Sequence, residues 1–427
     1  MVGGSASGRW DARDLERRLC KALDVAARAV PVLAVEGYSD VSNPEEVLRP
    51  AKVVAETAVL LLAAARATPA CKSVLERVAN VAQLLRPHAQ GDRVRALVCM
   101  EPALALDHCM AHVCLTQLGY LDEDLDGLLA QSLTSGAAAA RERLPHRELE
   151  QHWLRRLHRG SANIRDPDER SLLRRCALCT GLDPFSSSRD DVYAFTHALM
   201  YVTDLGSLKP RLPRSQGNIV GDAEAALAQS LAEDDYDLGA EVLLAWPMLG
   251  ARWTPAATFG FRVLTSVEDE AGFLPALSIR LDRYRALVGE ARTRYALASA
   301  YHTVYVMGLL CAAALGSGWL PAREVPHASR ARGAAARILD IIGSANPPPR
   351  WRECFGALDP PQQDCLGPLL MAMGLRQAAA SRELRTIKAL LEVAVEFGVV
   401  GGPAPRHGAE LLRRAARLGT TLQGPEL

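Results

Sequence analysis

Apolar residues recur along most of this chain at intervals of three and four, which is the spacing of helices that bury one face. Alternating polar and β-branched positions, which would indicate strands, are scarce by comparison. We therefore predict an all-α protein. The predicted helices cover residues 10–32, 44–65, 71–85, 102–118, 125–143, 148–157, 169–178, 190–205, 223–249, 292–315, 333–342, 365–378 and 383–397.

Proline and glycine mark the breaks between these helices, most clearly at 209–214 and 346–350, and both breaks are too short to act as free linkers. We predict a flexible tail at 1–9 and N-terminal helices at 10–95 that pack on the main body. The main helical-hairpin domain is predicted at 96–420, with a second tail at 421–427.

A short internal repeat suggests how the hairpins are arranged. The letters LAQSL occur at 129–133 and again at 227–231, after helices that carry His108 and His112, and His197 and Tyr201, respectively. A third histidine-bearing helix contains His302, and the intervals between the three helices correspond to about two hairpins each. We therefore predict an α/α toroid or a solenoid. In a toroid, the three histidines would point toward a common axis.

Composition restricts the partners. Lys+Arg and Asp+Glu both number 49, so no overall field favours nucleic acid or an anionic membrane. The stretch 295–320 has no Asp, Glu, Lys or Arg, but its continuous apolar part at 304–315 is shorter than the ~20 residues that span a bilayer, so we predict a buried helix. No signal peptide opens the chain, which predicts a cytoplasmic protein with reduced cysteines.

The segment 191–206 is the main candidate for a site, because it lacks Lys, Arg and Glu yet carries several polar side chains. On a helix, one sector of roughly 80° contains Tyr193, His197, Tyr201 and Asp204. We predict His197 as a general acid/base that Asp204 orients, with Tyr201 as a third catalytic residue and Tyr193 and Thr196 as ligand-binding residues. The alternative is that these groups only tie neighbouring helices together inside the core.

A second candidate lies at 294–305, where tyrosines are concentrated. Tyr301 and Tyr305 share a helix face, and Arg294 lies two turns earlier, so this stripe could offer a guanidinium and two phenols to a ligand. We predict Arg294, Tyr301, His302 and Tyr305 as ligand-binding residues. A packed aromatic stripe is the alternative.

Other motifs are weaker. His108 and His112 have the spacing of two metal ligands, and Cys176 and Cys179 form a CxxC, but neither has the further ligands of a metal site, so we predict no metal. Acidic clusters at 122–126 and 233–237 occur where helix ends or connecting turns are expected, so we predict that they are solvated. Leu238 breaks the DDxxD pattern of helical isoprenoid enzymes, which leaves such a cyclase as a remote option. No phosphate-binding or dinucleotide motif is present, and we predict no organic cofactor.

Two segments, DDVYAFTHALMYVTDLG and YHTVYVMGLLCAAAL, resemble those of a family of all-helical actinobacterial proteins of unassigned activity, often encoded among natural-product genes. The resemblance is best over 101–318. It implies an all-helical fold and marks His197, Tyr201, Asp204 and His302 as parts of shared segments, but it implies no reaction.

The leading hypothesis is a protein that binds or processes a small organic molecule or a peptide in a buried cavity lined by His, Tyr and Asp, in bacterial specialised metabolism. Whether it is an enzyme stays open. The alternative is a non-catalytic helical scaffold that holds a partner protein.

Overall fold

The structure is a computed structural model that describes residues 10–33, 48–67, 71–160, 167–327, 331–343 and 348–417. Helices account for nearly all of the regular structure in these segments, and no β-strand occurs within them. The prediction of an all-α protein is confirmed.

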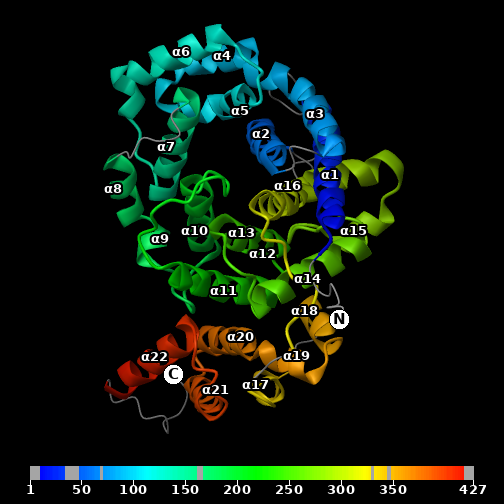
Figure 1. Ribbon diagram of the computed structural model, residues 1–427, viewed down its shortest axis with the longest axis vertical. Helices are drawn as coiled ribbons and strands as arrows, with labels where there is room; N and C mark the ends of the chain where they lie inside the picture. Colours follow the sequence, from blue (N-terminus) through cyan, green and yellow to red (C-terminus); the bar gives the residue numbers. More distant parts are fainter. Residues whose placement is uncertain are drawn as a thin grey trace, which may run out of the picture.

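The described helices form a closed ring in which six of them line the centre (Figure 1). Each inner helix contacts the next along the chain, and the last one returns to contact the first, so the ring is complete. The inner helices are α2 (Pro50–Ala67), α5 (Ala105–Gln117), α7 (Pro145–Arg159), α10 (Arg189–Val202), α12 (Tyr236–Leu243) and α16 (Gly289–Ser317). This arrangement is the toroid, rather than the open solenoid, of the two predicted alternatives.

A second layer of helices covers the inner ring from outside (Figure 1). Helix α1 (Ala12–Ala29) covers α16 and α2, and α3 (Lys72–Gln90) covers α2 and α5. Helices α4 (Asp92–Met100) and α6 (Glu123–Thr134) lie outside α5, while α8 (Pro167–Arg175) and α9 (Ala177–Thr180) lie outside α7 and α10. Helices α11 (Gln216–Ala232) and α14 (Pro255–Ala271) cover α12. The chain thus alternates between an outer and an inner position.

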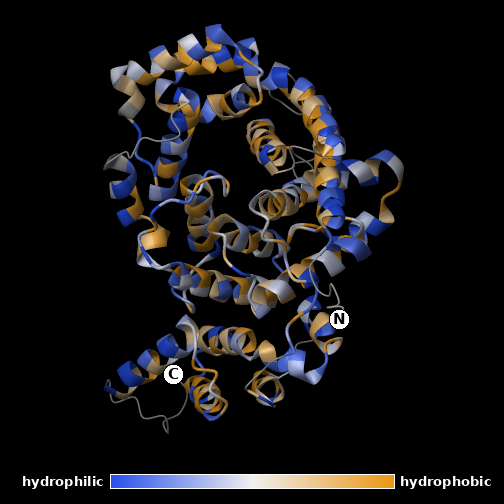
Figure 2. Cartoon of the chain, in the orientation of Figure 1, coloured by the Kyte–Doolittle hydropathy of each residue, from blue (hydrophilic) through white to orange (hydrophobic). Residues whose placement is uncertain are grey.

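Residue pattern decides which helix is inner and which is outer. The outer helix α1 buries Leu15, Leu19, Ala22, Ala26 and Ala29, spaced by three and four, and leaves most of its charged residues outside, with Arg18 as the buried exception. The inner helix α2 is buried on nearly every side from residue 57 to 64, because it contacts helices on both flanks and behind. Figure 2 shows the result, with hydrophobic faces turned toward neighbouring helices and hydrophilic faces turned outward.

The ring closes where α1 and α16 pack together. Gly308 allows this approach, because a Cβ at that position would lie 2.5 Å from the Ala22 Cβ. Beside it, the buried Arg18 side chain donates to Asp14 at 3.0 Å and to Asp269 at 2.9 Å, and also to Glu268. A buried arginine with three carboxylate partners therefore fastens the first helix to α14.

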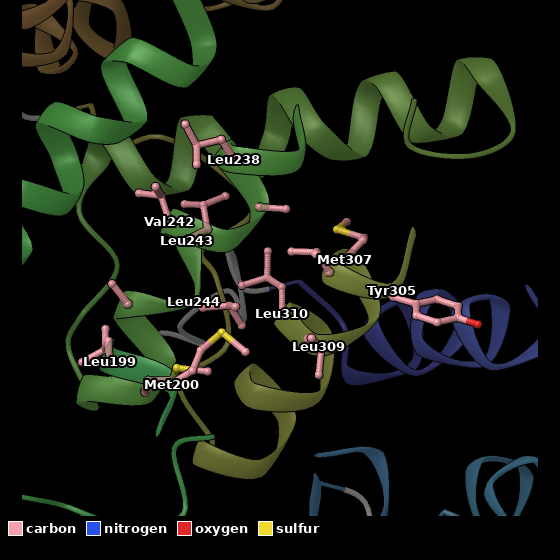
Figure 3. Close-up of a cluster of buried hydrophobic side chains, with 14 of the residues drawn as sticks. Leu199, Met200, Leu238, Val242, Leu243, Leu244, Tyr305, Met307, Leu309 and Leu310 are labelled. Atoms are coloured by element: carbon pink, nitrogen blue, oxygen red, sulfur yellow. The ribbon is translucent and has the colours of Figure 1, made fainter. Parts of the chain in front are cut away.

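Inside the ring, an apolar layer fills the junction of α10, α12 and α16 (Figure 3). Leu199, Leu243 and Leu310 belong to this layer, and Tyr305 directs its hydroxyl away from the leucines. Helix α16 is the one described helix long and apolar enough to cross a membrane, but 67% of its most apolar window is buried inside the protein. A mostly buried helix of this kind is also what the core of a water-soluble protein contains.

The remaining helices form a C-terminal unit below the ring (Figure 1). Helix α20 (Gly367–Ala380) joins this unit to the ring by packing on α11, and α18 (Arg350–Gly356) packs on α14. The other members are α17 (Ala334–Ile342), α19 (Pro360–Cys365), α21 (Leu384–Glu396) and α22 (Pro403–Arg417). Two short helices, α13 (Ala245–Leu249) and α15 (Leu281–Ala286), lie beside α16.

The structure differs from the predicted elements in several places. Five helices were not predicted at all, namely α4, α14, α15, α18 and α22, and the helix predicted at 125–143 ends at Thr134. The single helix predicted at 223–249 is three helices, because the chain turns at Asp234 with a φ of 50° and the helix is interrupted again at Leu244. The helix predicted at 190–205 ends at Val202, since Asp204 and Leu205 also have positive φ. The predicted boundary at residue 95 runs through the ring, because α2 is one of its inner helices. The tails predicted at 1–9 and 421–427 lie outside the described residues.

Candidate functional site

The centre of the ring is a cavity of about 530 Å³, and all six inner helices contribute side chains to it. Each helix presents residues spaced by three or four, which places them on one stripe that faces inward. Its charged and polar lining side chains include Lys52 and Glu56 from α2, Asp107 from α5, Arg147 and Glu150 from α7, Arg189, Asp190, Tyr193, His197 and Tyr201 from α10, Glu241 from α12, and His302 and Tyr305 from α16. The volume is in the range of small-molecule sites.

His302 lies at the focus of three carboxylates. Its Nε2 lies 2.8 Å from the Tyr193 hydroxyl, 3.5 Å from Asp237 Oδ1 and 3.8 Å from Glu241 Oε1, and its Nδ1 lies 3.0 Å from Glu56 Oε2. Burial alone would lower the pKa of His302, but the surrounding carboxylates outweigh it and raise the pKa to about 10. The ring is therefore an imidazolium at neutral pH.

Several atoms around His302 lack hydrogen bonds. Glu56 Oε2, Asp237 Oδ1 and His302 Nδ1 are buried, and none of the described residues gives them a hydrogen-bond partner of proper geometry. Burial raises the pKa of Asp237, whereas His197, His302 and Thr196 outweigh the burial of Glu241 and hold the pKa of that carboxyl below its usual value. The two N–H groups of the His302 imidazolium are therefore too few to hydrogen-bond the oxygens of all three carboxylates around it.

His197 is oriented by its own helix. Its Nδ1 lies 2.9 Å from the carbonyl oxygen of Tyr193 and 3.8 Å from Glu241 Oε2, and its ring stacks on the Tyr193 ring. A carbonyl oxygen only accepts, so Nδ1 carries a hydrogen and the lone pair of the neutral ring is on Nε2. None of the described residues hydrogen-bonds Nε2. That nitrogen is free to accept a proton from a molecule in the cavity.

Tyr201 and Thr196 also bond to carboxylates of the cavity. The Tyr201 hydroxyl donates to Glu150 Oε1, and Arg147 donates to both oxygens of the same carboxylate at 3.0 Å. Burial, followed by the charge of Glu150, raises the pKa of Tyr201, so its hydroxyl stays protonated. The Thr196 hydroxyl lies 2.9 Å from Glu241 Oε2. Both residues therefore hold acidic side chains in position.

Asp204 does not orient His197. It lies beyond the end of α10, in the left-handed turn, and its Oδ1 accepts from Trp153 Nε1 at 2.6 Å and from Arg66 Nη1 at 2.9 Å. The prediction assumed that the helix continues through residue 204, and the turn that ends the helix at Val202 turns the carboxylate away. Asp204 is a structural anchor between α2, α7 and α10, and the carboxylate beside His197 is Glu241.

The other predicted residues divide between the cavity and its surroundings. Tyr305 lines the cavity, and its hydroxyl lies 3.1 Å from Thr57 Oγ1. Tyr301 faces a different cavity between α1 and α16, where burial and the charge of Glu56 raise its pKa. Arg294 is exposed and pairs with Glu290 at 3.0 Å, because the N-terminal part of α16 extends beyond the ring. It does not reach the central cavity.

Three histidine-bearing helices were predicted to point their histidines toward a common axis, and two of them do. His197 and His302 line the cavity together, but His108 bonds Glu101 at 2.9 Å away from it. His112 bonds Asp126 at 2.9 Å, on the side of α5 that faces α6. No group of three His, Cys, Asp or Glu side chains within the described part of the chain could hold a metal ion.

Several cavity residues were not found from the sequence. Glu56 and Glu241 each interrupt an apolar run, which was a signal in the sequence, whereas Glu150 lies in the polar stretch 145–152 and had no such signal. The cluster at 233–237 was predicted to be solvated, but Asp235 and Asp237 are buried, because Arg189 bonds them at 2.7 and 2.9 Å. Asp235 also accepts from the backbone of Leu238 and caps α12.

Comparison with protein families decides the family. A family model for a domain of unknown function, DUF6895, matches residues 19–312, which is more than half of the chain. The chain belongs to the DUF6895 family. The DUF6895 region runs from α1 to α16 and therefore coincides with the ring, while the C-terminal unit lies outside it. Neither the search of curated proteins nor the search of solved structures found a match.

Proposed function

We propose that the DUF6895 ring binds a small organic molecule or short peptide that carries a protonated amine, and that the amine sits among the carboxylates of the central cavity. The observation that carries this proposal is the charge around His302. The four carboxylates of Glu56, Asp235, Asp237 and Glu241 surround three cations, Lys52, Arg189 and His302. A ligand ammonium would supply donors to buried oxygens that have none.

The exposed part of the cavity lining has more cations than carboxylates, since its exposed carboxylates are Asp107 and Asp190. The side chains of Lys52, Arg147 and Arg189 line the cavity and are about half exposed, whereas Glu150 and Glu241 are almost fully buried. A ligand with an amine at one end and a carboxylate at the other would meet both regions favourably. Amino acids and short peptides have this chemistry, and so do many amine-containing natural products, which agrees with a role in bacterial specialised metabolism.

A catalytic role is supported by one further contact. No described residue hydrogen-bonds His197 Nε2, and the Tyr193 hydroxyl, which His302 contacts, stays protonated because burial and nearby carboxylates raise the pKa of Tyr193. An acid and a base in one cavity are the elements of proton transfer to and from a bound substrate. In an enzyme of this design, Glu241 would orient His197, and Tyr201 would hold Glu150 in place.

The test compares primary amines, amino acids and dipeptides with their N-acetylated counterparts, by thermal unfolding and calorimetry on the full chain. We expect at least one free amine to bind, with a stabilisation of about 2.7 kcal/mol at a hundred times its Kd, and its acetylated form to bind at least tenfold more weakly. Glu241→Gln should weaken binding of the amine. The matched control is Glu392→Gln, because Glu392 is an exposed carboxylate on α21. Equal binding of amine and amide would refute the proposal.

The alternative is a scaffold that holds a partner protein without a small ligand. In that case no member of the panel would bind. Glu241→Gln would then change only the stability of the protein, because the charges in the cavity would serve only to fix how the inner helices align with one another.

A further inference from the structure

A second cavity of about 550 Å³ lies outside the ring, between α1, α15 and α16, and has a different chemistry from the central one. Its floor is apolar, formed by Val25 of α1, Phe273, and Leu297, Ala300 and Val304 of α16. These side chains are buried or half-buried, so the floor is a continuous part of the α1–α16 junction. We call it the α1–α16 cavity.

The edge of the α1–α16 cavity is strongly basic. Among the described residues that line it, the only carboxylate is Asp24, and the cations are Arg17, Lys21, Arg28, Arg77 and Arg292. Arg77 pairs with Asp24 at 2.8 Å, and Lys21 pairs with Glu268 at 3.0 Å. Arg17 pairs with Asp14 at 2.6 Å, so the positive charge that remains without a carboxylate partner is on Arg28 and Arg292.

Two of the arginines have no carboxylate partner within the described structure. Arg28 is exposed on α1, and no contact is found for its guanidinium. Arg292 donates to the backbone carbonyls of Leu287 and Arg285 and lies over the Tyr284 ring, with 5.6 Å from its Cζ to the ring centroid. Arg292 is therefore held in place by neutral groups, and its charge is available to a ligand.

The segment 273–288, which borders this cavity, is also amphipathic. Phe273 and Tyr284 meet edge to face at 5.2 Å and form its aromatic wall. The same segment leaves Leu277, Leu281 and Val288 exposed by 56%, 40% and 73%. Figure 1 shows α15 at the outer edge of the ring, beside α1. Apolar surface and arginine therefore occur together both inside and around the cavity.

We propose that the α1–α16 cavity binds an amphipathic anion, whose acyl chain lies on the apolar floor and whose carboxylate lies between Arg28 and Arg292. A purely polar anion would leave the floor in contact with water, and an uncharged hydrocarbon would leave the arginines without a partner. A fatty acid satisfies both parts. The site is independent of the central cavity and of the amine proposed to bind there.

The test measures dodecanoate binding to the full chain by calorimetry, below the micellar concentration. We expect one site, about tenfold weaker binding of decanoate because two methylenes are lost, and much weaker binding of dodecyltrimethylammonium, dodecanol and AMP. Arg28→Gln should weaken dodecanoate about tenfold, since it removes a charged hydrogen bond at an exposed position where folding does not depend on it. Arg385→Gln, an exposed arginine on α21, is the matched control.

Further variants separate the outcomes. Ala296→Trp should fill the floor and abolish binding, with circular dichroism and thermal unfolding confirming that it folds, while Glu241→Gln should leave dodecanoate binding unchanged. Binding of the cationic detergent or AMP as tightly as dodecanoate would overturn the proposal. So would unchanged affinity in both Arg28→Gln and Ala296→Trp. Association with anionic phospholipid vesicles alone, without binding of monomeric dodecanoate, would also overturn it.

Discussion

Replacing Arg18 with alanine tests how the ring is closed. Arg18 is 1% exposed and Glu268 is similarly buried, and the arginine also bonds Asp14 and Asp269. Removing one partner of a buried ion pair costs about 3–5 kcal/mol, because the other charge is left without compensation. Lys21 remains 3.0 Å from the second oxygen of Glu268, so we expect a loss near the lower limit, about 3 kcal/mol.

Urea unfolding, followed by circular dichroism, measures this loss. Arg17→Ala is the matched control, because Arg17 pairs with the same Asp14 and Asp269 but is 57% exposed, and its loss should cost below about 1 kcal/mol. Adding Glu268→Gln to Arg18→Ala should restore part of the stability, since the buried charge is then gone. If Arg18→Ala and Arg17→Ala unfold at free energies within 1 kcal/mol of each other, Arg18 does not fasten the ring as described.

Three further predictions concern other parts of the ring. Gly308→Ala should lower the free energy of unfolding in urea by about 1–3 kcal/mol, because the new Cβ would meet Ala22. Gly127 on α6 has open space around it, so Gly127→Ala should raise the free energy of unfolding by up to about 1 kcal/mol. Equal effects of the two substitutions would contradict the close approach of α1 and α16. His302 should titrate near pH 10 by NMR. Since this pKa lies above the unfolded value of about 6.5, the contribution of His302 to stability is complete below pH 6.5 and is lost as the pH rises through 10. A titration midpoint below pH 7 would show that the carboxylates do not stabilise the charged form of His302. Asp204→Asn should destabilise by about 1–3 kcal/mol through weakened bonds from Trp153 and Arg66, and an unchanged unfolding free energy would remove its anchoring role.

Much of the architecture could be predicted from the sequence because it depends on helix periodicity. The regular spacing of apolar residues in α1 and α10 determines both the helix and its buried face. The interval between His197 and His302, which corresponds to about two helical hairpins, also indicated that outer and inner helices alternate along the chain. The turn at Asp234 was not predicted, because a non-glycine residue with positive φ has no strong local signal in an acidic run.

The site was predicted only in part, for a related reason. Tyr193, His197 and Tyr201 on α10 and His302 on α16 were found because they stand out within these two largely apolar helices. Their partners Glu56, Glu150 and Glu241 come from α2, α7 and α12, and only the closure of the ring brings these helices together. Asp204 shows the converse error, since a helical wheel places it beside His197 and the end of the helix at Val202 separates them.

The contact between α1 and α16 has a consequence for the order of folding. These helices stand at opposite ends of the DUF6895 region, and Arg18 bonds a residue 250 positions away. During synthesis, α2 and α5 leave the ribosome long before α16, so their apolar surfaces wait for the last inner helix. Contacts of such long sequence separation form slowly, and an open half-ring exposes surface that aggregates. We expect ring closure to be the rate-limiting step of refolding, and the unclosed chain to be the form that chaperones recognise.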